Sequence, residues 1–177
     1  MKIYMIGGKA RNGKDCVASI IKKVYEEKQL KVLNLQYSSY IKEYAKKISG
    51  WDGLEETKPR ALLQQLGTEV IRNKIDPLFF VKRIIGDIKV YSYYFDILTV
   101  SDIRAKVEID EPKKELVNIV SILVVRPNFD NGLTLEQKNH YTEKDLDDYN
   151  KFDYTIINDG NLEDLELKVR QMIENES

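Results

Sequence analysis

Cysteine, histidine and tryptophan each occur only once among the 177 residues of the chain. A single cysteine, Cys16, excludes a disulfide bond within the chain and is typical of a reducing compartment. No apolar run approaches the roughly 20 residues that a membrane helix needs. The first apolar run, Ile3 to Ile6, is too short for the core of a signal peptide. We therefore expect a cytoplasmic protein with no membrane partner.

A net charge is also nearly absent, because 28 basic side chains are balanced by 29 acidic ones. Proteins that bind polymeric nucleic acid usually carry a basic excess that neutralises phosphates, so this class of partner is disfavoured. Small anionic ligands need only local positive charge and stay compatible with the composition. Since 42% of the residues are hydrophobic, we expect one folded domain, residues 1–177, with a single core.

Short β-forming runs alternate with stretches whose apolar residues recur at helical spacing. The runs predict five strands, at residues 2–6, 31–37, 95–100, 116–125 and 154–157. The predicted helices cover residues 14–28, 38–48 (with Ser38 or Ser39 as the cap), 60–73, the segment after Asp76-Pro77, and 162–173. Strands that alternate with helices indicate parallel βαβ units. The predicted fold class is therefore α/β, with about five parallel strands between helices on both faces.

Residues 126–149 break this alternation. The segment contains Pro127, Asn131-Gly132 and a dense run of polar residues, together with the single histidine, His140. Irregular segments of this length in a compact domain are usually functional lids or disordered. We expect residues 126–149 to form a lid insert.

The most specific motif follows the first predicted strand and opens the first predicted helix. It has the pattern G-x-x-x-x-G-K and consists of Gly8, Lys9, Ala10, Arg11, Asn12, Gly13 and Lys14. Its glycines let the backbone curl so that successive N–H groups point inward and bind an anion. The helix N-terminus adds partial positive charge, and Lys14 is expected to reach the β- and γ-phosphates of a nucleotide. The sequence therefore predicts a loop that binds nucleotide phosphates.

An acidic residue, Asp15, follows Lys14 at the position where serine or threonine is usual. Its carboxylate can serve Mg²⁺, which prefers hard oxygen ligands, or can favour the first turn of the helix through its charge. We favour the metal role and keep the second open. The adjacent Cys16 is expected to be a small packed residue with its backbone N–H in the anion site.

Polar residues follow the third predicted strand, at the carboxyl end where open α/β sheets bind their ligands. Asp102 is expected there as a second support for Mg²⁺, with an exposed loop acid as the alternative. Arg104 is suited to an acceptor phosphate, because its planar guanidinium pairs with two phosphate oxygens. Tyr37, at the end of the second predicted strand, could face a base. Arg126 is expected either to stack on a base or to hold a transferring phosphate.

Two other residues give weaker signals. Arg72 closes the predicted helix 60–73 and, taken alone, has the pattern of a solvated surface residue. His140 is not expected to be a general base, because phosphoryl transfer depends mainly on positioning and charge neutralisation.

Four parts of the chain together resemble the phage-type deoxynucleoside monophosphate kinases, a branch of the P-loop nucleoside monophosphate kinase fold. The first is the phosphate loop with its Lys-Asp ending, and the second is LQQLGTEVIR, Leu63 to Arg72. The third is VSDIR, Val100 to Arg104. The fourth combines Val125-Arg126 with residues 140–146 and 157–160. The likeness therefore covers nearly the whole chain.

The resemblance implies a three-layer P-loop kinase fold with an acceptor-binding helical region at about 38–93 and a lid at about 126–149. It implies ATP-dependent phosphorylation of a nucleoside or deoxynucleoside monophosphate to the diphosphate. Gly8 to Cys16 would bind the ATP phosphates. The acceptor would be bound by Arg72, Arg104 and Gln65, with Tyr37 added from the residue pattern. The adenine side would hold Arg126, Asn158 and Gly160, and the candidate catalytic residues are Lys14, Arg104 and Arg126.

Two alternatives stay open. Animal-type phosphomevalonate kinases share the Gly-Lys-Asp loop and a Ser-Asp-x-Arg strand end, so another phosphorylated small molecule is an alternative acceptor. Gln64 and Gln65 favour a base over that acceptor. A non-catalytic ATP-binding regulatory module is the other alternative, because residues 127–149 contain no arginine. We expect ATP with Mg²⁺ and a small phosphorylated acceptor, and we leave a homodimer open.

Overall fold

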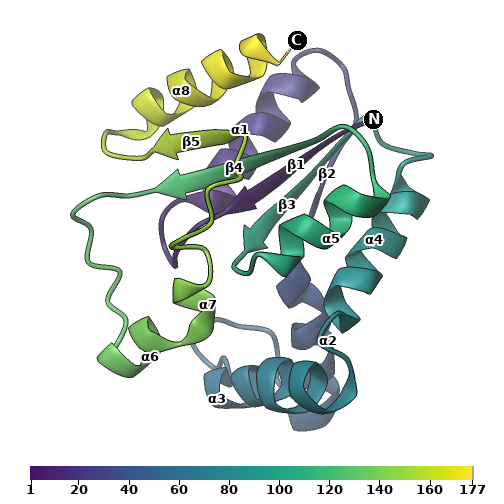
Figure 1. Ribbon diagram of the computed structural model, residues 1–177, viewed down its shortest axis with the longest axis vertical. Coiled ribbons are helices and arrows are strands. Elements are labelled where there is room, and N and C mark those ends of the chain that lie inside the picture. Colours follow the sequence, from purple (N-terminus) through teal and green to yellow (C-terminus); the bar gives the residue numbers. More distant parts are fainter. Residues whose placement is uncertain (177) are drawn as a thin grey trace.

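A parallel sheet of five strands forms the centre of the computed structural model, which describes residues 1–176; Ser177, the end of the predicted domain, lies outside them. The strands are ordered β2-β3-β1-β4-β5 (Figure 1). They are β1 (Lys2–Gly7), β2 (Val32–Leu35), β3 (Ile97–Ile103), β4 (Ile119–Val125) and β5 (Tyr154–Ile157). The central strand β1 pairs with β3 on one side and β4 on the other. The predicted parallel α/β sheet is confirmed.

Helices cover both faces of this sheet. Alternate residues of β1 point to opposite sides, so this strand contributes to two cores. Tyr4 and Ile6 belong to a core shared with α1 (Lys14–Glu26) and α8 (Leu162–Asn175). Ile3 and Met5 belong to the opposite core. That core is shared with α2 (Tyr37–Ser49), α4 (Phe79–Tyr91) and α5 (Val107–Glu115). The residues Ile3 to Ile6 are completely buried, as expected for a central parallel strand covered on both faces.

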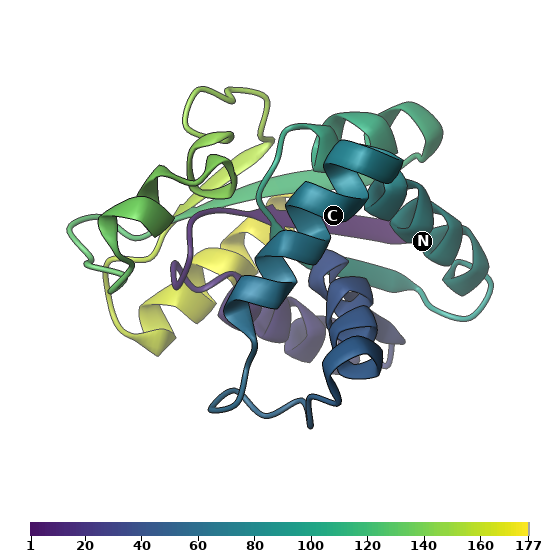
Figure 2. The same ribbon diagram turned by 90° about the horizontal axis from the view of Figure 1, so that it is seen from below.

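A helical arm extends from the layer of helices that contains α2 and α4. It lies at the end of the sheet to which β1, β3 and β4 point (Figure 1). It consists of α3 (Arg60–Gln64) and a π-helix, η1 (Gln65–Ile75). In Figure 2 this arm crosses in front of the sheet, beside the insert at residues 126–149. The sequence predicted a single α-helix over 60–73. The helical extent is confirmed, but the i→i+5 bonding of a π-helix changes the angular spacing of the side chains after Gln65.

Three local predictions differ from the structure. Helix α5 was not predicted, because it is highly charged and contains Pro112, so it lacks a clear apolar period. The second strand ends at Leu35 rather than at Tyr37, which already begins α2. The expected serine cap of α2 is wrong. The carboxylate of Asp102 instead accepts the backbone N–H groups of Tyr37 and Ser38, at 2.8 and 2.9 Å.

The insert at 126–149 contains two short helices, α6 (Leu135–Asn139) and α7 (Tyr141–Lys144). Both lie at the same end of the molecule as η1 (Figures 1 and 2). Thr134 forms a capping box with Gln137 at the start of α6. The imidazole of His140 pairs with the hydroxyl of Thr142 at the start of α7. Within residues 1–176, no helix is long and apolar enough to cross a membrane.

Candidate active site at the carboxyl ends of the strands

The glycine-rich loop runs from the end of β1 to the start of α1. Two of its glycines have positive φ angles, 143° at Gly8 and 101° at Gly13. A Cβ atom at Gly8 would lie 2.4 Å from the Val124 carbonyl oxygen, and one at Gly13 would lie 2.6 Å from Nδ2 of Asn158. No other residue type fits both the backbone conformation and these neighbours. The glycines of the motif are therefore required by the shape of the loop.

Two asparagine side chains fasten this loop to the neighbouring strands. The side-chain amide of Asn12, which is buried, donates to the Val124 carbonyl at 2.9 Å. The side-chain amide of Asn158, just after β5, donates to the Asn12 carbonyl, also at 2.9 Å. The sequence placed Asn158 on the adenine side and gave no hint of this second role. The contact joins residues that are 146 positions apart, which local patterns do not reveal.

The side chain of Lys14 lies inside the loop. Its ammonium group is buried and donates to the carbonyl oxygens of Gly8 and Lys9, both at 2.8 Å. Burial lowers the pKa of Lys14 to about 8, the nearby Arg104 acts in the same direction, and Glu143 and Asp15 oppose the shift. Lys14 is therefore a cation at neutral pH, held at the loop by backbone carbonyls.

A cavity of about 780 Å³ opens beside the loop. Its wall brings together residues that the sequence singled out separately, namely Arg11, Gly13, Lys14, Asp15, Cys16, Asp102, Arg104, Arg126, Asn158 and Gly160. Cys16 was expected to be packed, but it is exposed. The reason is that it lies on the first turn of α1, on the side that faces the cavity rather than the core.

Two carboxylates face the cavity from different elements. Asp15 accepts hydrogen bonds from the Ser101 hydroxyl at 2.8 Å and the Gln36 side-chain amide at 3.0 Å. Asp102 also lines the cavity, although its two oxygens cap α2. Asp15, Asp102 and Ser101 form an oxygen-rich group that fits a hard cation such as Mg²⁺. Among residues 1–176, no group of three or more His, Cys, Asp or Glu side chains is placed to hold a metal ion.

An anion already lies between the glycine-rich loop and Arg104. It is the carboxylate of Glu143, from α7 of the insert. One oxygen accepts the backbone N–H of Ala10 at 3.0 Å, and the other pairs with the Arg104 guanidinium. Glu143 is buried, and the sequence analysis missed it because its partners are 133 and 39 residues away. One backbone N–H of the loop and the Arg104 guanidinium thus bind the same carboxylate.

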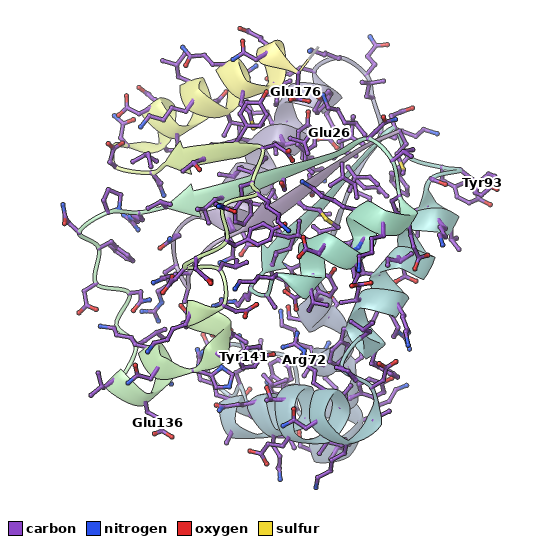
Figure 3. All side chains as sticks on the ribbon, viewed as in Figure 1. Glu26, Arg72, Tyr93, Glu136, Tyr141 and Glu176 are labelled. Carbon is purple, nitrogen blue, oxygen red and sulfur yellow. The ribbon has the colours of Figure 1, made fainter. Side chains whose placement is uncertain are left out.

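Arg72, at the end of η1, is not among the residues that line the cavity; it contacts α5 and α7 instead. Its side chain is only 18% exposed and donates to the Glu108 carboxylate at 2.5 Å, so it is not a solvated surface residue. The guanidinium lies over the Tyr141 ring, 5.5 Å from its centroid. Figure 3 shows the two labelled side chains next to one another between η1 and α7. The Tyr141 hydroxyl is buried and has no hydrogen-bond partner among the described residues.

Three other predicted site residues differ from one another in their position relative to the cavity. Tyr37 is 3% exposed, and its hydroxyl donates to the Glu108 carbonyl at 3.0 Å. It does not face the cavity, contrary to expectation, because α2 begins at Tyr37 and turns the ring into the core. Gln65 is exposed at the start of η1. Arg126 is exposed, lines the cavity and stacks on Phe129 of the insert at 3.8 Å.

These features together define a P-loop kinase: a parallel sheet, a glycine-rich loop with the buried Lys14, and an adjoining cavity lined by Arg104. The sequence family described as deoxynucleotide monophosphate kinase matches residues 34–169. The chain belongs to this family. It is therefore a phosphotransferase that acts on nucleotide or small phosphorylated substrates, and kinases of this class use ATP with Mg²⁺.

Solved structures with the same fold are similar over almost their full length. Shikimate kinase from Aquifex aeolicus has a TM-score of 0.55 at 15% identity, with 99% of this chain and 98% of that chain covered. APS kinase from Mycobacterium tuberculosis, in complex with AMPPNP and APS, has a TM-score of 0.57 at 12% identity and coverages of 98% and 97%. Dephospho-CoA kinase from Campylobacter jejuni has a TM-score of 0.54 at 13% identity and coverages of 98% and 96%. These likenesses support the fold. Comparison with curated proteins gives no match.

Proposed function

We propose that the protein transfers the γ-phosphoryl group of ATP to the phosphate of a deoxynucleoside monophosphate, giving ADP and the deoxynucleoside diphosphate. The observation that carries the proposal is the position of the Glu143 carboxylate. It is held at once by a backbone N–H of the phosphate loop and by the Arg104 guanidinium. An anion at that point contacts both the phosphate loop, which we assign to the donor, and Arg104, which we assign to the acceptor. Phosphoryl transfer requires such a point, because the donor and acceptor phosphates must meet in line.

The described residues can be assigned to the two substrates. The loop from Gly8 to Cys16 binds the donor phosphates, and Lys14 follows the negative charge of the transferring group. Arg104 and Arg72 clamp the acceptor phosphate, one of whose oxygens attacks the γ-phosphorus. The bond from that phosphorus to the bridging oxygen of ADP breaks as the new bond forms. No protein group has to exchange a proton in this step.

The bases are assigned to opposite ends of the cavity. Arg126, Asn158 and Gly160 line it on the side of β4 and β5, and we assign the adenine to them. Ile41 and Leu63 line it on the side of the helical arm, where the acceptor base would pack. Gln65 is exposed on the same arm, so it would read that base only at its edge.

Mg²⁺ bound with ATP would supply charge neutralisation at the phosphates. We propose Asp15 as its main protein support and Asp102 as the second, since both carboxylates line the cavity. Asp15 bonds to side chains of Ser101 and Gln36 rather than capping its own helix, which favours the metal role over capping. Asp102 is additionally tied to α2 through Tyr37 and Ser38.

Replacing Asp15 tests this assignment. We expect Asp15→Asn to raise the Mg²⁺ concentration needed for half-maximal rate, because an amide is a poorer ligand for a hard cation than a carboxylate. Asp15→Ser should keep partial activity, because a hydroxyl is the usual ligand at this position. The measurement is the initial rate as a function of Mg²⁺ at fixed ATP. Unchanged half-saturation in Asp15→Asn would leave Asp15 only an effect on the helix terminus.

We further propose that residues 126–149 close over the bound nucleotides, as lids of such enzymes do. Glu143 must then leave the N–H of Ala10 when a phosphate takes that place. A bisubstrate analogue, an adenosine and a deoxynucleoside joined through five phosphates, should reduce amide hydrogen exchange across this segment. The second half of α8, residues 169–175, does not line the cavity, so it serves as the internal reference and should not change. Equal exchange of residues 126–149 with and without the analogue would contradict a lid.

The acceptor can be identified by following ADP formation while candidate acceptors are added in turn. The candidates are the common nucleoside and deoxynucleoside monophosphates, with phosphomevalonate as the non-nucleotide comparison. We expect at least one deoxynucleoside monophosphate to accelerate ATP consumption far above the rate without acceptor. Acceleration by phosphomevalonate alone would replace the proposed acceptor class.

A further inference from the structure

One buried carboxylate outside the phosphate loop is bonded to both proposed acceptor arginines. Glu108 lies in the first turn of α5 and is 2% exposed. Its Oε1 atom accepts from the Arg72 guanidinium at 2.5 Å. Its Oε2 atom accepts the backbone N–H groups of Arg104 at 2.8 Å and Ala105 at 3.1 Å. The two oxygens of one side chain thus join the end of η1 to the turn after β3.

The main chain of Glu108 adds a third connection. Its carbonyl oxygen accepts the hydroxyl of Tyr37 at 3.0 Å, and the backbone N–H of Tyr37 is in turn bonded to Asp102. Helix α2 is therefore tied to the same point. Arg72 and Arg104 extend from different elements, and Glu108 bonds to both of those elements and to a third that forms the cavity wall.

The burial of this charge is costly, and the contacts around it show how it is balanced. A carboxylate removed from water needs a partner cation and hydrogen bonds to stay ionised. Burial raises the pKa of Glu108, while Arg72 and the backbone N–H groups of Arg104 and Ala105 lower it. A fold that needed only packing at this position would do as well with an apolar residue. Charge at Glu108 is useful if it fixes the direction of another charged group.

We infer that Glu108 is a positioning residue that sets the two acceptor arginines as a pair. It holds the guanidinium of Arg72 directly, and it fixes the backbone from which the Arg104 side chain extends. The inference rests on the proposed roles of Arg72 and Arg104 in acceptor binding. An acceptor phosphate then meets two guanidiniums whose directions are already set, which reduces the ordering cost of binding.

The test separates positioning from a merely structural role by comparing the two substrates. Glu108→Gln keeps the size of the side chain but removes its charge. We expect the KM for the acceptor to rise about 10- to 150-fold, the range for loss of a hydrogen bond to a charged group. The KM for ATP should change little, because the side-chain hydrogen bonds of Glu108 go to Arg72, Arg104 and Ala105 and not to the phosphate loop. Glu115→Gln is the matched control and should behave as wild type, because it removes an exposed charge of α5 that pairs only with Lys89 of α4 among the ion pairs of residues 1–176.

A double-mutant cycle with Arg72→Ala then tests the coupling. In the Arg72→Ala background, Glu108→Gln should raise the acceptor KM by less than in the wild type, because one of the two guanidiniums that Glu108 positions is gone. Purely additive effects would overturn the inference. If Glu108→Gln does not fold, Glu108→Asp, which withdraws the charge from Arg72 by one methylene, should show the same split between acceptor and ATP.

The outcomes distinguish the inference from the proposed function. If Arg72→Ala and Arg104→Ala raise the acceptor KM but folded Glu108→Gln does not, positioning by Glu108 is wrong and the acceptor site stands. If neither arginine variant changes the acceptor KM, the acceptor site itself is wrong, whatever Glu108→Gln does.

Discussion

Lys14→Ala should reduce kcat by about 10²-fold or more, the usual cost of removing a group that stabilises charge in the transition state. The ammonium group of Lys14 is buried at the phosphate loop and held by the carbonyls of Gly8 and Lys9. It is therefore already placed where the transferring phosphoryl group gains negative charge. The measurement is kcat at saturating ATP and acceptor.

The loss should be catalytic rather than structural. The pKa of Lys14 lies near 8, below the ordinary value of 10.5, because the amine is buried. The folded state therefore disfavours the ammonium form below pH 8, and this penalty disappears as pH rises from about 8 to 10.5. Removing the charge at pH 7 should not unfold the protein, and a thermal melt checks this. Lys22→Ala, an exposed lysine on the same helix, is the matched control. A folded Lys14→Ala with near-wild-type kcat would refute the role of the loop.

Arg104→Ala should raise the acceptor KM by about 10- to 150-fold, which corresponds to losing about 1.5–3 kcal/mol of charge-assisted hydrogen bonding. Arg104 lines the cavity at the end of β3, and its guanidinium binds a carboxylate at the phosphate loop. An acceptor phosphate should take the place of that carboxylate. The kcat should fall as well, because the guanidinium also orients the acceptor for attack. The KM for ATP should change little.

Steady-state kinetics with each substrate varied in turn provides the measurement. Arg72→Ala should act in the same direction, and Arg170→Ala is the control, because Arg170 lies on α8 and pairs with Glu27 and Glu166. If the KM for ATP rose and that for the acceptor did not, Arg104 would belong to the donor site. The proposed acceptor pocket would then be wrong.

Much of the fold and of the donor site followed from local sequence patterns. The phosphate loop is predictable because its shape depends on glycines at fixed spacing and on the strand and helix that flank it. The strands were found because their apolar runs are short, continuous and bounded by polar segments, as in a sheet buried on both faces. Asp15, Asp102 and Arg104 were predicted because they lie next to the phosphate loop or at the carboxyl end of a strand, and all three line the cavity.

The contacts that complete the site could not be predicted in this way, because they join distant residues. Glu143 reaches Ala10 across 133 positions, and Glu108 reaches Arg72 across 36. Tyr37 was misplaced because the second strand ends at Leu35, so that Tyr37 lies in the first turn of α2 and its ring packs into the core. Periodicity describes one element at a time, whereas the residues of this site come from many elements.

The most direct measurement is the fate of the γ-phosphoryl group itself. ATP labelled in that group is incubated with the protein, Mg²⁺ and the deoxynucleoside monophosphates, and the labelled products are separated. If the loop and Arg104 bring the two phosphates together, the label will appear in the terminal phosphate of a deoxynucleoside diphosphate, and Lys14→Ala will abolish most of it. Label found only in inorganic phosphate, with no labelled nucleotide product, would contradict transfer to a nucleotide acceptor.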